Sequence, residues 1–90
     1  AVPRPSNEFL LRGRSALVAK RYDESVRELS KCIELEARNF ECYRLRAQSY
    51  SDMGKFDQSI ADYTFVLNAN PTDAETFVSR GLVYVKRTQG

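Results

Sequence analysis

Apolar and aromatic residues recur along this chain with helical spacing. Tyr43, Ala47 and Tyr50 stand at positions i, i+4 and i+7 and therefore lie on one face of a helix. Similar faces are formed by three further sets, namely Val26, Leu29 and Ile33; Ile60, Tyr63 and Leu67; and Phe77, Gly81 and Tyr84. The pattern predicts helices over residues 7–19, 23–36, 40–53, 57–69 and 74–87.

The chain also repeats itself with a period of 34 residues. The stretch GKFDQSIADY at 54–63 is matched by KRYDESVREL at 20–29. Positions that align under this shift are Phe9, Tyr43 and Phe77; Arg12, Arg46 and Arg80; Gly13, Ala47 and Gly81; Tyr22 and Phe56; Asp23 and Asp57; Ser25 and Ser59. A fixed period in this range indicates a stacked repeat protein, in which one unit cannot bury its apolar face alone. We therefore expect an all-α fold of antiparallel helix pairs.

Turn residues support these boundaries. Gly54 tolerates a positive φ at the end of one helix, and Asp57 is expected to cap the next. Pro71 stops a helix, and Thr72 with Glu75 forms a capping-box pattern that opens another. We expect an extended tail over 1–5 and one repeat domain over 6–90, divided into repeat 1 (6–39), repeat 2 (40–73) and a partial repeat 3 (74–90).

Small and aromatic residues occupy fixed places in each unit. Gly13, Ala47 and Gly81 are expected to be small because the two helices of a pair approach closely there. Ser25 and Ser59 are expected to lie against the partner helix. The aromatic set should fill the gap between neighbouring units, since aromatic rings bury much area per residue; it comprises Phe9, Tyr43 and Phe77.

In these positions the sequence resembles the tetratricopeptide repeat, over residues 6 to about 87. The second unit carries the signature as Tyr43, Arg46 with Ala47, Tyr50, Ser59, Tyr63 and Pro71. The first unit has Phe9, Arg12 with Gly13, Ala16, Ser25, Leu29 and Ala37, so it lacks the Tyr and the Pro; the third has Phe77, Arg80 with Gly81, and Tyr84. The resemblance implies a right-handed superhelix.

The resemblance further implies that the first helices of the units line a concave groove that binds a protein or peptide partner. The expected groove residues are Leu10, Leu11, Arg14, Leu17, Val18, Arg44, Leu45, Gln48, Asp52, Glu75, Val78, Ser79 and Leu82. Alternatively, the leucines at 11 and 17 pack between repeats. The function expected from this groove is that of a scaffold or adaptor for protein–protein interaction.

Some relatives of this type hold a C-terminal carboxylate in a clamp of two Lys, two Asn and one Arg. The matching positions here are Leu10, Arg14, Leu45, Glu75 and Ser79. Arg14 is the one cation among them, and Glu75 would repel a carboxylate. We therefore do not expect the C-terminal tails of the Hsp70 and Hsp90 chaperones to be partners.

The arginines at 12, 46 and 80 form a ladder that could bind an anion. In an antiparallel pair, however, Arg12 can approach Glu28 and Arg46 can approach Asp62, so we expect internal ion pairs. Arg80 has no equivalent acid in its own unit. The alternative function is binding of an anionic partner such as nucleic acid through arginines, namely Arg12, Arg14, Arg44, Arg46 and Arg80.

The amino-acid composition mainly excludes certain functions and types of site. A net charge of +2 and 42% apolar residues are typical of an ordinary folded, water-soluble protein. The chain has no His, which removes the usual general base, so we expect no enzyme, no cofactor and no metal site. Cys32 and Cys42 are expected to be reduced, small apolar residues. With no membrane-spanning run, we expect a cytoplasmic, soluble location and no membrane partner.

The helix expected at 74–87 is apolar on several sides, although a terminal repeat helix should have a polar outer face. Something is therefore expected to cover it. Either these 90 residues belong to a longer repeat array, which a first residue other than Met fits, or two copies self-associate through this helix.

Overall fold

The computed structural model describes residues 5–90, and this part of the chain is all α-helical. Its helices are α1 (Pro5–Val18), α2 (Tyr22–Leu35), α3 (Phe40–Asp52), α4 (Phe56–Ala69) and α5 (Ala74–Gln89). The five predicted helices are confirmed, with ends that shift by at most two residues. The expected tail lies mostly outside the described residues, but Pro5 already belongs to α1, since proline is tolerated in a first helical turn.

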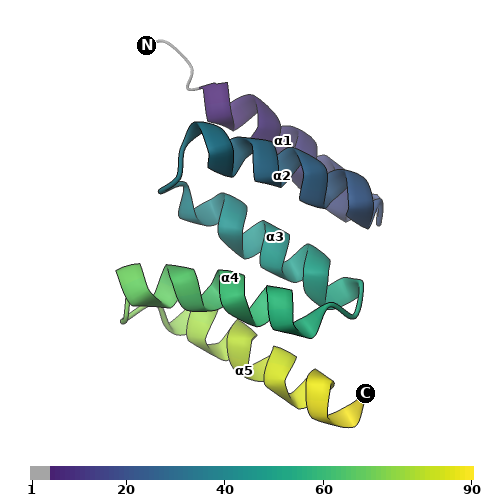
Figure 1. Ribbon diagram of the computed structural model, residues 1–90, viewed down its shortest axis with the longest axis vertical. Coiled ribbons are helices and arrows are strands. Elements are labelled where there is room, and N and C mark those ends of the chain that lie inside the picture. Colours follow the sequence, from purple (N-terminus) through teal and green to yellow (C-terminus); the bar gives the residue numbers. More distant parts are fainter. Residues whose placement is uncertain (1–4) are drawn as a thin grey trace.

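The helices follow one another in chain order along the longest axis, and each runs opposite to its neighbours (Figure 1). Each helix packs on the next, and α1 also contacts α3. The molecule measures 44 × 29 × 17 Å, so it is an elongated stack. This arrangement confirms the all-α fold of consecutive antiparallel helices. The right-handed superhelical path stays a prediction.

The predicted turn at Gly54 is confirmed, since its φ is +78°. Lys20, one period earlier, adopts a φ of 62°, so the same left-handed turn occurs in both units. Two predicted caps are wrong. Asp57 lies inside α4, whose cap residue Lys55 makes no side-chain bond. Thr72 does not cap α5.

The residue that caps α5 is Asp73. Its side chain accepts hydrogen bonds from the Thr76 backbone N–H at 3.1 Å and from Thr76 Oγ1 at 2.8 Å. Because these bonds favour the charged carboxylate, with a further contribution from Arg44, the pKa of Asp73 lies below its ordinary value. The cap is one residue later than the sequence pattern indicated.

The expected close approach between paired helices is confirmed in the first two units. A Cβ added to Gly13 would lie 2.5 Å from the Leu29 side chain, which is fully buried. Ser25 Oγ donates to the Gly13 carbonyl at 2.9 Å, and Ser59 Oγ donates to the Ala47 carbonyl at 2.7 Å. The small residues therefore allow both contact and a buried hydrogen bond between paired helices.

The expectation of reduced cysteines is wrong. Cys32 near the end of α2 and Cys42 near the start of α3 form a disulfide, with their Cα atoms 6.5 Å apart. Both are fully buried beside Leu29, and Phe9, Leu10, Ile33 and Leu45 pack around this cluster. Turning back of the chain between α2 and α3 brings the two thiols together. Disulfides are typical of oxidising compartments, so the cysteines no longer support a cytoplasmic location, which stays a prediction.

A second core cluster joins α3, α4 and α5. It contains Ala47, Tyr63 and Val83, with Phe56 and Ile60 packed against it. The core thus continues from one unit to the next, as expected for a stack. None of the helices within residues 5–90 is long and apolar enough to cross a membrane.

The third unit departs from the expected packing. Phe77 is 62% exposed and does not fill a gap between units. Apart from the residues next to Gly81 and the backbone of α5, no atom lies within 4 Å of a Cβ added to Gly81, so the predicted close approach is absent there. The physical reason is that no helix among the described residues packs on this side of α5.

Candidate functional site

Two adjoining hollows lie between α3 and α5 and together form what we term the α3–α5 groove. The first, of about 130 Å³, is lined by Glu41, Arg44, Leu45, Gln48, Tyr63, Glu75, Thr76 and Ser79. The second, of about 280 Å³, is lined by Gln48, Ser51, Asp52, Tyr63, Ser79, Leu82, Val83 and Lys86. Because Gln48, Tyr63 and Ser79 border both hollows, the groove is continuous along the two helices.

Tyr63 reaches the groove from α4, behind α3 and α5. Its side chain is largely buried, and this burial raises the pKa of its phenol, while a hydrogen bond with Ser79 acts in the opposite direction. From the sequence, Tyr63 is expected only as part of the repeat framework. The feature of the sequence that could have indicated a role in the groove is the Tyr63 hydroxyl, since the aligned residue in the first unit is Leu29, which carries no hydroxyl.

Charges of both signs border the groove. Arg44 lies 3.4 Å from Glu41 and 3.3 Å from Asp73, so its guanidinium is already paired. Asp52, Glu75 and Lys86 make no ion pair with any other residue in the range 5–90. Glu75 borders the first hollow, whereas Asp52 and Lys86 border the second. The groove therefore offers two unpaired carboxylates and one unpaired ammonium group.

Several expected groove residues are brought together here, namely Arg44, Leu45, Gln48, Asp52, Glu75, Ser79 and Leu82. Three others are not part of the groove lining. Leu10 is half-buried against the disulfide cluster, and Val78 is 59% exposed outside both hollows. Arg14 lies 3.5 Å from Glu41, so it links α1 to α3 at the side of the groove.

The remaining residues expected from α1 also lie elsewhere. Leu17 is buried, which agrees with the alternative that it packs between helices. Leu11 is exposed and borders a different hollow, shared with α2 residues such as Arg27. Val18 is exposed at the end of α1. The groove is thus built by the second and third units.

The predicted arginine pairs are confirmed. Arg46 donates two hydrogen bonds to Asp62, at 2.9 and 2.8 Å, and this pairing raises the pKa of the guanidinium. Arg12 lies 3.8 Å from Glu28 and also pairs with Glu8. Arg80 makes no ion pair within the described range, and it donates to Thr64 Oγ1 at 3.1 Å. The charges of Arg12 and Arg46 are therefore neutralised by carboxylates of the same chain.

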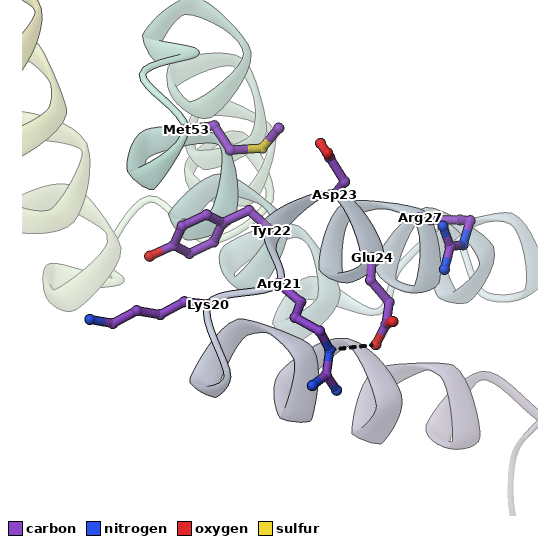
Figure 2. Close-up of a pocket in the computed structure, with 7 residues that line it drawn as sticks. All are labelled: Lys20, Arg21, Tyr22, Asp23, Glu24, Arg27 and Met53. Atoms are coloured by element: carbon purple, nitrogen blue, oxygen red, sulfur yellow. Dashed lines mark hydrogen bonds and ion pairs between the residues drawn. The ribbon is translucent and has the colours of Figure 1, made fainter.

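A hollow of about 640 Å³, larger than either part of the groove, surrounds the turn between α1 and α2. Figure 2 shows that Arg21 pairs with Glu24 there, while Lys20, Asp23 and Arg27 point in different directions. Tyr22 and Met53 border its other side. These side chains do not converge on a common point, so we do not assign a site to this hollow.

Within residues 5–90, no group of three or more His, Cys, Asp or Glu side chains is placed to hold a metal ion. The α3–α5 groove is the place where most of the expected binding residues meet, and its lining is of mixed polarity. No model of a known protein family matches this sequence.

Proposed function

We propose that this chain is a protein–protein interaction module that binds a peptide segment of its partner in the α3–α5 groove, as a scaffold or adaptor of the tetratricopeptide type and without catalysis. The observation that carries this proposal is the continuous groove between two helices of equivalent position in successive units. The resemblance of the repeat positions supports it independently.

The groove also indicates which peptides it would bind. Gln48 and the Tyr63 hydroxyl lie near its middle and can exchange hydrogen bonds with a peptide backbone, while Leu82 offers an apolar contact. The unpaired carboxylates of Glu75 and Asp52 border different hollows, so basic side chains of the peptide can pair at both. An acidic C-terminal tail is disfavoured, since Glu75 would repel it.

The alternative, binding of nucleic acid or another anion through arginines, has less support. Arg12, Arg14, Arg44 and Arg46 all face carboxylates in this structure, at 2.5 to 3.8 Å. Their positive charge is thus compensated before any anion arrives. Affinity for an oligonucleotide that falls steeply with salt would revive this alternative.

A selection from a random peptide library tests the proposal. Peptides that bind the wild-type domain should lose binding to a Gln48→Lys, Leu82→Lys variant, because both side chains border the groove and both are solvent-exposed. A Gln58→Lys variant, at an exposed α4 position that borders neither hollow, is the matched control and should bind normally. If the selected peptides bind the groove variant as well as the wild type, the groove is not the binding site.

A further inference from the structure

One side of α5 differs from the equivalent sides of α1 and α3. In the first two units the aligned residues other than the exposed Arg12 are buried or half-buried, as Gly13 and Ala16 are in α1 and Ala47 is in α3. In α5 the same positions are exposed, except that Arg80 is half-buried. We term this set the open face of α5; it comprises Phe77, Arg80, Gly81, Tyr84 and Val85. It is separate from the α3–α5 groove, so nothing argued for it depends on the proposed function.

The helices that cover the equivalent faces make the same three interactions twice. A serine hydroxyl donates to the carbonyl of the small residue, in Ser25 to Gly13 and in Ser59 to Ala47. An acid three residues after the serine pairs with the arginine, in Glu28 with Arg12 and in Asp62 with Arg46. The next residue packs over the small one; these residues are Leu29 and Tyr63.

The open face of α5 carries the residues that would take part in each of these three interactions. Arg80 donates to Thr64 Oγ1 at 3.1 Å, just as Arg46 donates to Ser30 Oγ at 3.1 Å, but Arg46 has Asp62 in addition. Space above Gly81 is empty to 4 Å. Phe77 is 62% exposed, whereas the aligned Tyr43 is buried, and Tyr84 is 41% exposed, whereas the aligned Tyr50 is half-buried. The open face of α5 therefore lacks three partner groups that α2 and α4 supply to the equivalent faces: a carboxylate, a serine hydroxyl and an apolar side chain. Their spacing in α2 and α4 shows where these groups would lie.

We propose that the open face of α5 binds an amphipathic helix from another polypeptide, with the sequence pattern Ser, any two residues, Asp or Glu, then Leu or Tyr. This helix packs antiparallel to α5 as α4 packs on α3. Its acid pairs with Arg80, its serine lies against Gly81, and its Leu or Tyr fills the space above Gly81.

A folded second copy of this chain is a poor source of that helix. The pattern occurs in α2 and α4, but their serines and acids are already buried within the fold, with exposed fractions of 0% for Ser25 and Ser59 and 8% and 6% for Glu28 and Asp62. Presenting them to a neighbour would require opening of a hairpin. A separate helix with the same pattern carries no such cost.

The test uses a synthetic peptide with the sequence of residues 55–70, which includes α4, added to the isotope-labelled domain and followed by NMR. We expect shifts in the amide signals of residues 77–85. Gly81→Leu should weaken binding at least about tenfold by filling the space, while circular dichroism confirms an unchanged fold. Ser15→Leu, at an exposed position of α1, is the matched control and should bind as the wild type does.

A charge exchange tests the chemistry. A peptide with Asp62→Lys should bind the wild-type domain at least about tenfold more weakly, and it should regain affinity for an Arg80→Glu domain. Absence of shifts in residues 77–85, or equal binding by the Gly81→Leu domain, would overturn the proposal. The proposal would also be overturned by a dimer, detected by sedimentation, whose contact lies on this face. Binding that occurs only when the peptide is covalently joined to residue 90 would overturn it as well.

Discussion

Gly13 and Gly81 stand at equivalent positions in the first and third units, yet their surroundings differ completely. A Cβ on Gly13 would lie 2.5 Å from Leu29, whereas nothing lies within 4 Å of one on Gly81. Glycine is thus required at position 13 because α2 packs closely over it, whereas at position 81 no helix among the described residues requires it. In a repeat protein, a residue that fits no local need can indicate a surface prepared for another helix.

The largest expected effect concerns the junctions between units. The α2–α3 junction carries the disulfide of Cys32 and Cys42, whereas the aligned residues at the α4–α5 junction are Val66 and Thr76, both buried. Because the bridge closes a loop with a sequence separation of 10, reduction should lower the free energy of unfolding by about 3 kcal/mol. Urea denaturation with and without reductant measures this.

A Cys32→Val, Cys42→Thr variant adopts the residues of the second junction and serves as the control. Its stability should be independent of reductant. Equal stability of the oxidised and reduced wild type would show that the bridge contributes nothing beyond packing.

The next effect compares the arginines of the second and third units. Asp62→Ala should destabilise the fold by about 2–3 kcal/mol, because the Arg46 guanidinium, only 20% exposed, loses both of its hydrogen bonds to Asp62. Arg80→Ala should cost less than about 1 kcal/mol, since Arg80 pairs with no carboxylate in residues 5–90. Thermal unfolding of both variants checks this, and equal losses would contradict the distinction.

The two glycines should respond to alanine with opposite signs. Gly13→Ala should destabilise by about 1–3 kcal/mol, because the new methyl group meets the buried Leu29 side chain. Gly81→Ala should stabilise by about 0.5–1 kcal/mol, since alanine favours the helix and the space is open. Denaturation midpoints measure both, and a loss at position 81 would mean that the face is covered in solution.

The smallest effect compares the helix caps Asn39 and Asp73. Asn39→Ala should change stability little, since Asn39 makes no capping bond to α3. Asp73→Ala should cost about 1 kcal/mol at neutral pH because the bonds to Thr76 are lost.

The contribution of Asp73 should also depend on pH. Its pKa is lowered in the folded state, so its stabilisation is fully present above the ordinary value of about 3.9 and is lost as pH falls through the folded value. Unfolding measured from pH 7 to pH 2 should therefore bring the Asp73→Ala variant and the wild type together at low pH. A difference that stays constant would contradict the assigned cause.

Much of the fold could be predicted from the sequence because the 34-residue period and the small residues act locally. Gly13, Ser25 and Ser59 indicated where helices meet, and the structure adds their hydrogen bonds. The disulfide could not be predicted in this way, because a spacing of ten residues does not fix the distance between Cys32 and Cys42. That distance depends on how α2 turns back into α3.

The candidate site was predictable only in part. Gln48 and Leu82 follow from the repeat register, since the helices that bear them are equivalent. Leu10 occupies the register position of Arg44 but packs against the disulfide cluster because it is apolar, whereas Arg44 pairs with Asp73. Tyr63 is not predictable as a groove residue because its ring belongs to the core, while its hydroxyl makes a hydrogen bond with Ser79 of the groove.

Amide hydrogen exchange at Ala47 and Gly81 tests most directly whether α5 has an open face in solution. Both residues lie within helices, but only the surroundings of Ala47 are covered. We expect Ala47 to exchange only with global unfolding and Gly81 to exchange at least about tenfold faster through local opening of α5. Equal protection of the two amides would contradict the account, since it would mean that the face is already covered in the isolated domain.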